Sequence, residues 1–161
     1  GSIRYFIKKN LNSNIKIHNS VKKHLKDELK YKMNNFETYI KFGDKVKKSK
    51  KNLIFVFNNI KKKNKKIIGY GSTAKSVTIL NYCKINSEIL DYFVDTTPNK
   101  TNKYMPGTHI FVKNYKKSLL DGVDYIFLGA WNFKDEIFKK EKKFIKKGGK
   151  FITHIPIPKI I

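Results

Sequence analysis

A short glycine turn at residues 65–75 constrains the fold of this chain more than any other stretch. The segment reads Lys-Lys-Ile-Ile-Gly-Tyr-Gly-Ser-Thr-Ala-Lys, which predicts a buried strand, a turn of the form G-x-G-x-x-A and the start of a helix. We expect Gly69 to turn the chain sharply, Gly71 to let the backbone approach a bound group, and Ala74 to permit close helix–strand packing. Free N–H groups and the dipole at the helix start favour a phosphate. A tight turn that binds nothing is the alternative for this pattern taken alone.

The sequence after residue 65 alternates between apolar runs and amphipathic segments, which predicts a Rossmann-like α/β domain. We expect a parallel sheet of about five strands, with right-handed crossovers and flanking helices. The predicted strands cover residues 66–70, 90–95, 109–112, 123–128 and 150–154, and the predicted helices cover residues 73–85, 114–120 and 134–147, the last ended by Gly148 and Gly149. The proline-containing tail at 155–158 cannot continue a central strand.

The first 64 residues lack this alternation and predict a helical attachment to the α/β domain. Residues 1–18 read as an extended segment and a loop, the end of a preceding domain, and Gly1-Ser2 is either native or a cloning remnant. Ser20 is the expected N-cap of a helix that runs to about Met33, and a longer helix with an apolar period of three to four residues follows to about residue 60. The predicted division is therefore residues 1–18, a helical linker at 19–64 and the Rossmann-like domain at 65–161.

The net charge of +24 raises the alternative of a nucleic-acid-binding protein. However, Arg4 is the single arginine among 36 basic residues, and arginine is the side chain favoured for phosphate and base-edge recognition. The lysines are spread along the whole chain, which favours a solvated lysine surface. We therefore do not expect a nucleic-acid partner.

Composition also limits the expected location and metal content. No run of 18 consecutive apolar residues occurs, so no membrane partner is expected, and the start lacks the apolar core of a signal peptide. A single cysteine, Cys83, fits a reducing cytoplasm. One cysteine and four histidines without ligand spacing predict no metal site.

Residues with binding chemistry fall mostly at the carboxyl ends of the predicted strands, where ligands bind in open parallel sheets. Asp95 follows Gly71 at about the spacing of a ribose-binding acid, so NAD is a candidate ligand, and an Asp that caps the following turn is the alternative. His109 and His154 are candidate ligands or bases, although strand-end histidines commonly serve as ordinary hydrogen-bonding partners. The candidate substrate- or nucleotide-binding residues are Gly69, Tyr70, Gly71, Ser72, Thr73, Lys75, Asp95, Pro98, Lys100, His109, Trp131, Asn132 and His154, and no catalytic residue is assigned.

Two kinds of contact are expected from this set. Ser72, Thr73 and Lys75 at the helix start are the candidates for phosphate. Tyr70 and Trp131 are candidates for stacking on a base or a sugar, with core packing as the alternative for Trp131.

Three blocks of the sequence together resemble one known family. They are residues 69–75 with 80–83, residues 91–95 with Pro98, Lys100 and 106–110, and residues 130–137 with 148–152. They resemble the C-terminal domain of C-methyltransferases that depend on S-adenosylmethionine (SAM) and act on nucleotide-linked deoxysugars. The resemblance extends from about residue 65 to 158, and residues 1–5 look like the end of the family's methyltransferase domain.

The resemblance implies that the chain is the substrate-binding C-terminal fragment of such an enzyme. In that family a zinc-binding segment and a SAM-binding domain precede this region, so SAM and structural zinc would belong to the missing part, and no cofactor is expected on the fragment. The implied partners are a nucleotide-sugar and the missing SAM-binding domain, and the fragment alone is expected to be inactive. A stand-alone nucleotide sensor and a dehydrogenase-like NAD-binding module remain the alternatives.

Overall fold

The computed structural model describes residues 3–9 and 14–161. Contacts divide the chain into two compact units, residues 1–44 and residues 45–161. Gly1-Ser2 and residues 10–13 of the predicted loop lie outside the described residues.

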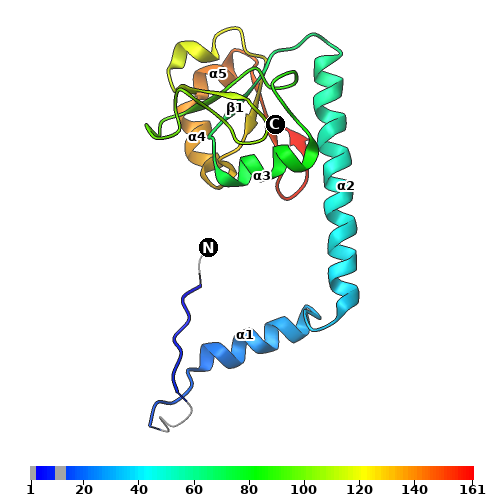
Figure 1. Cartoon of the computed structure of the whole chain (residues 1–161), viewed down its shortest axis with the longest axis vertical. Helices are drawn as coiled ribbons and strands as arrows, with labels where there is room; N and C mark the ends of the chain where they lie inside the picture. The colour runs from blue at the N-terminus through cyan, green and yellow to red at the C-terminus, as the bar shows by residue number, and fades with distance from the viewer. Residues whose placement is uncertain (1–2, 10–13) are drawn as a thin grey trace. The chain divides into compact units, whose positions relative to one another are not determined.

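The first unit contains α1 (Asn19–Lys30) and the first turns of α2 (Phe36–Lys61) (Figure 1). Residues 3–9 form neither helix nor strand. Both helices were predicted, but Ser20 as the N-cap is wrong, because the helix begins at Asn19 and the imidazole Nδ1 of His18 accepts the N–H of Ser20 at 3.2 Å. An imidazole nitrogen thus satisfies an N–H group that the helix start leaves without a partner.

Gly43, in the middle of α2, is a position where substitution should stabilise the protein. A Cβ there would meet no atom within 4 Å beyond the helix's own backbone. Because glycine loses more backbone entropy than alanine in a helix, we expect Gly43→Ala to raise the free energy of unfolding by about 1 kcal/mol. Urea denaturation followed by circular dichroism measures this change, and a loss of stability would contradict it.

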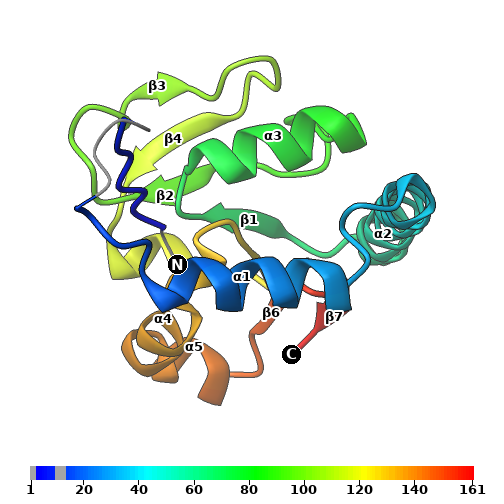
Figure 2. The ribbon, with the colours of Figure 1, turned by 90° about the horizontal axis from the view of Figure 1, so that it is seen from below.

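The second unit is built on a seven-stranded sheet in the order β3-β4-β2-β1-β5-β6-β7 (Figure 2). Its strands are β1 (Ile67–Tyr70), β2 (Phe93–Asp95), β3 (Lys103–Tyr104), β4 (Phe111–Asn114), β5 (Tyr125–Leu128), β6 (Lys150–Thr153) and β7 (Lys159–Ile160). The five inner strands are parallel, as predicted, whereas β3 and β7 pair antiparallel at the two edges. The Rossmann-like α/β fold is therefore confirmed, but the sheet is mixed and larger than expected.

Helices cover both faces of this sheet (Figure 2). One hydrophobic cluster joins the sheet to α3 (Ala74–Cys83) and to α2, whose Phe57 ring lies 5.6 Å from that of Phe127. The second cluster lies on the opposite face, under η1 (Lys117–Leu120), α4 (Lys134–Lys140) and α5 (Lys142–Lys146). The five parallel strands therefore lie between two helical layers.

The predicted helix over 134–147 is interrupted at Glu141, which lies between α4 and α5. Its side chain is buried, and one carboxylate oxygen accepts hydrogen bonds from two tyrosine hydroxyls. The predicted glycine cap is confirmed: Gly148 has φ +89°, and its N–H and that of Gly149 donate to carbonyls of α5.

Candidate functional site

The strand order reverses beside β1, and this defines where a ligand crevice is expected. β1 leads through α3 to β2 on one side, whereas the later chain crosses over to place β5 on the other side. The loop after β5 folds onto the end of β1, with the N–H groups of Gly129 and Ala130 donating to the Tyr70 carbonyl at 2.9 and 3.2 Å. We refer to residues 71–75, 95–100 and 129–132 as the carboxyl edge.

The glycine turn is made by Gly71 rather than by Gly69. Gly71 has φ +82°, and a Cβ there would lie 2.5 Å from the Cβ of Ala130. Gly69 instead lies inside β1, where a Cβ would come within 2.3 Å of the Phe93 ring. The prediction that Gly69 turns the chain is wrong because the strand continues through Tyr70. Within this chain, the close approach that Gly71 permits is made by Ala130.

Asp95 ties the turn after β1 to the turn after β2. Its side chain is only 7% exposed, and its oxygens accept the N–H groups of Ser72 at 2.7 Å and of Thr97 at 2.8 Å. The Lys100 ammonium lies 3.8 Å away. The turn-capping alternative for Asp95 therefore describes the structure. The Ser72 N–H, which faces the diphosphate of a dinucleotide in the usual NAD-binding turn, is therefore already bonded to Asp95.

The start of α3 is closed by its own side chains. Thr73 is the N-cap, and its hydroxyl accepts the N–H of Ser76 at 3.1 Å. Ser76 is fully buried, and its hydroxyl donates to the Gly71 carbonyl at 3.0 Å. A Cβ on Gly129 would lie 2.2 Å from this hydroxyl, so the loop after β5 packs directly on the turn. The Thr73 hydroxyl is therefore used to cap the helix and is not free to bind a ligand through the same lone pair.

Lys75, Trp131 and Asn132 do come together on the surface of the carboxyl edge. The Lys75 ammonium donates to the Asn132 side-chain carbonyl at 3.1 Å and lies 5.1 Å from the centre of the Trp131 ring. Trp131 is half-buried, with part of its ring packed against the second core cluster and part exposed. A cation, an amide and an aromatic ring thus converge beside the start of α3.

The remaining candidates are dispersed. Pro98 is exposed in the loop after β2. His109 is exposed just before β4 begins, which puts it at the amino end of the sheet, away from the carboxyl edge. His154 follows β6 at the correct end but is only 4% exposed, with its ring stacked 5.2 Å from that of Phe127.

Burial of His154 should make stability depend on pH. Burial lowers its pKa from 6.5 to about 4, so the imidazole is neutral in the folded state where it is charged in the unfolded state. The unfolded chain then binds more protons between these two values, and stability is full above about pH 6.5 and falls towards pH 4. We expect a loss of up to about 3 kcal/mol across this window.

Urea denaturation at several pH values measures this loss. His154→Gln should flatten the dependence, whereas His109→Gln, at an exposed histidine, should leave it unchanged. The pKa of Asp124 is lowered from 3.8 by Lys65 and by the Lys66 N–H, so this carboxylate titrates below the window. Equal pH slopes in the two variants would contradict the role of His154.

Sequence reasoning missed Glu141 and Tyr115 on the opposite face of the sheet, and the structure buries Tyr70 beside them, where it does not reach the carboxyl edge as a stacking surface. Tyr70 and Tyr115 donate their hydroxyls to the same Glu141 oxygen at 2.9 and 2.6 Å. Burial is the first cause that raises the pKa of both phenols, and Glu141 raises it further. A signal existed, because Glu141 falls at helical spacing between the apolar Ile137 and Phe144.

Two classes of feature are not found in the part of the chain that the structure describes. No cluster of three or more His, Cys, Asp or Glu side chains could hold a metal ion there. Among the same residues, no helix has the length and apolar character needed to cross a bilayer.

Comparison with known proteins agrees with the resemblance in the three sequence blocks. The sequence matches the C-methyltransferase C-terminal domain family over residues 1–156. It is also 35% identical over 97 residues to the C-methyltransferase NovU of Streptomyces niveus. That match covers 60% of this chain and 23% of NovU, so the chain spans less than a quarter of the length of this relative. The chain belongs to the C-methyltransferase C-terminal domain family.

Proposed function

We propose that this chain is the substrate-binding C-terminal domain of a SAM-dependent C-methyltransferase that modifies a nucleotide-linked sugar. The observation that carries the proposal is the convergence of Lys75, Trp131 and Asn132 beside the start of α3. Family membership and the position of this group at the switch point of the sheet support it.

Each member of this group offers one element of nucleotide-sugar recognition. The ammonium of Lys75, in the first turn of α3, attracts phosphate. The Trp131 ring offers a face to a base or a sugar, and the amide of Asn132 offers both a donor and an acceptor to hydroxyls. Asp95 keeps the turn in place, because its carboxylate holds the N–H of Ser72.

The methyl donor would be held by another part of the parent enzyme. SAM supplies the methyl group, and structural zinc belongs to that part as well; the residues of this chain bind and orient the sugar. The exposed apolar side chains of Val21, Leu25 and Leu29 lie at helical spacing on α1 and offer a surface for the SAM-binding domain. The buried, unpaired Cys83 suits a reducing cytoplasm.

Titration of the chain with a dTDP-sugar, followed by ligand-observed NMR, tests this location. We expect Lys75→Gln and Trp131→Ala each to weaken binding by about tenfold, the effect of one charge-assisted or stacking contact. Lys84→Gln is the matched control, because Lys84 caps the other end of α3. Equal weakening by Lys75→Gln and Lys84→Gln would place the ligand elsewhere. Methyl transfer by the 161-residue chain alone would also contradict the proposal.

A further inference from the structure

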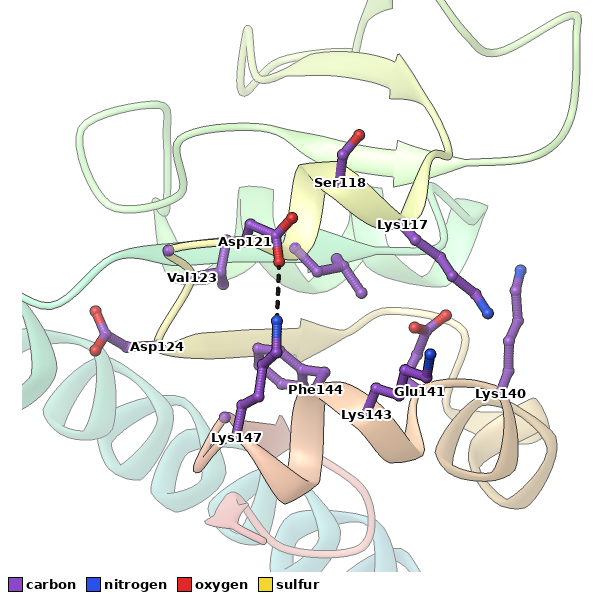
Figure 3. Close-up of a pocket in the computed structure, with 13 residues that line it drawn as sticks. Lys117, Ser118, Asp121, Val123, Asp124, Lys140, Glu141, Lys143, Phe144 and Lys147 are labelled. Atoms are coloured by element: carbon purple, nitrogen blue, oxygen red, sulfur yellow. Dashed lines mark hydrogen bonds and ion pairs between the residues drawn. The ribbon is translucent and has the colours of Figure 1, made fainter.

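A cavity lies on the face of the sheet opposite α3, between η1 and α5 (Figure 3). Its volume is about 570 Å³, within the range of pockets that bind small molecules. The cavity is lined by η1, the ends of α4 and α5 and the residues that precede β5, and it includes none of the carboxyl-edge residues. This cavity is therefore a feature separate from the proposed sugar-binding group.

The lining carries more positive charge than its carboxylates neutralise. Four lysines line the cavity, one each from η1, α4 and α5 and one that directly follows α5, and of these Lys147 is paired with Asp121 at 3.4 Å. Among the described residues no carboxylate lies within ion-pair distance of Lys117, Lys140 or Lys143. Figure 3 shows Lys117 and Lys140 directed towards the same end of the cavity, the end where the Glu141 carboxylate lies.

Glu141 provides a hydrogen-bond acceptor at this end of the cavity. The residue is only 3% exposed and lines the cavity, and both tyrosine hydroxyls bond to its Oε1. The two donated hydroxyls occupy the lone pairs of Oε1. Neither of these bonds uses Oε2, which leaves an acceptor for a ligand hydroxyl. Phe144 and Leu120 supply apolar surface beside it.

We propose that this cavity binds a small hydroxylated phosphate of the hexose-phosphate class. The phosphate group lies among the ammonium groups of Lys117, Lys140 and Lys143, a sugar hydroxyl donates to Oε2 of Glu141, and the sugar ring lies against Phe144. Each contact matches the charge and hydrogen-bonding capacity of the lining. The site is independent of the proposed function, since it shares no residue with the carboxyl edge.

Isothermal titration of the whole chain with three probes tests the proposal. We expect glucose 6-phosphate to bind more tightly than inorganic phosphate, and neutral glucose not to bind. The double variant Lys117→Gln/Lys143→Gln should weaken the binding of glucose 6-phosphate by at least about tenfold. The matched control Lys139→Gln/Lys142→Gln removes the same charge from α4 and α5 outside the cavity and should weaken binding less than about twofold.

Glu141→Gln tests the hydroxyl contact separately. A glutamine oxygen can still accept from both phenols, but its amide group replaces the second acceptor with a donor. We therefore expect this variant to lose most of the preference for glucose 6-phosphate over inorganic phosphate, while its affinity for inorganic phosphate stays within about twofold of the wild-type value. Lys75→Gln should change neither affinity, which separates this site from the carboxyl edge.

Three results would overturn the proposal. They are no binding of glucose 6-phosphate at about 10 mM, equal weakening by the two double variants, and equal affinities of the wild-type chain for glucose 6-phosphate and inorganic phosphate. The last result would mean that surface lysines attract phosphate without any contact from Glu141.

Discussion

Replacing Asp95 with alanine should lower the free energy of unfolding by about 4 kcal/mol and abolish ligand binding at the carboxyl edge. Its carboxylate accepts the N–H groups of Ser72 and Thr97, and it is 7% exposed. A hydrogen bond to a charged group contributes about 1.5–3 kcal/mol, and the variant loses two of them. The turn that carries Ser72 then loses its link to the end of β2. Urea denaturation measures the stability, and titration with a dTDP-sugar measures the binding.

A graded series makes this test specific. Asp95→Asn keeps the shape and one acceptor oxygen but turns a donor towards one of the N–H groups. We therefore expect it to lower the free energy of unfolding by about half as much as Asp95→Ala does. Asp91→Ala removes an exposed carboxylate four positions earlier in the chain and should change stability by less than about 0.5 kcal/mol. If Asp95→Ala were as mild as Asp91→Ala, the two turns would not depend on this carboxylate.

Gly71→Ala should destabilise the protein to a similar extent, by about 4 kcal/mol. A residue with a side chain at φ +82° costs roughly 1–2 kcal/mol, and the new Cβ would come within 2.5 Å of the Cβ of Ala130. Overpacking of this kind adds about 1–3 kcal/mol, since the loop after β5 is held to Tyr70 by two hydrogen bonds. Thermal and urea denaturation measure the loss.

Gly122 provides the matched control, because it has φ +71° but no atom within 4 Å of the position of a Cβ. Gly122→Ala should therefore cost only the backbone strain, roughly 1–2 kcal/mol. The double variant Gly71→Ala/Ala130→Gly should recover about 1–2 kcal/mol of the loss, because it removes the atom in closest contact. Equal losses of stability for Gly71→Ala and Gly122→Ala would show that contact with the loop after β5 does not add to the cost of a side chain at position 71.

The sequence was sufficient to predict the core of the fold. Strands β1, β2, β5 and β6 follow from apolar runs that are largely buried, and the helices between them follow from their apolar period. β4 was predicted two residues too early, at 109–112 instead of 111–114, because only Val112 of this strand is buried. β3 and β7 have two residues each, are exposed and take their conformation from the neighbouring strand. A run that short has no periodicity that could reveal it.

The candidate site was predicted less completely, because its contacts join residues distant in the sequence. Spacing placed Asp95 at the correct edge, but no local pattern shows that its carboxylate holds the N–H of Ser72. The contact between Gly71 and Ala130 likewise depends on the strand order. His109 was included for its residue type, and the direction of β4 puts it at the other end of the sheet.

The central claim is that the carboxyl edge binds a nucleotide-sugar, and a thermal-shift comparison of a dTDP-sugar, NAD and SAM on the whole chain tests it most directly. A ligand at about 100 times its dissociation constant stabilises the folded state by roughly 2.7 kcal/mol, which raises the melting temperature of a domain of this size by several degrees. We expect the dTDP-sugar alone to raise it, and Lys75→Gln to reduce that shift. A shift with NAD alone would contradict the claim and identify a dehydrogenase-like module instead.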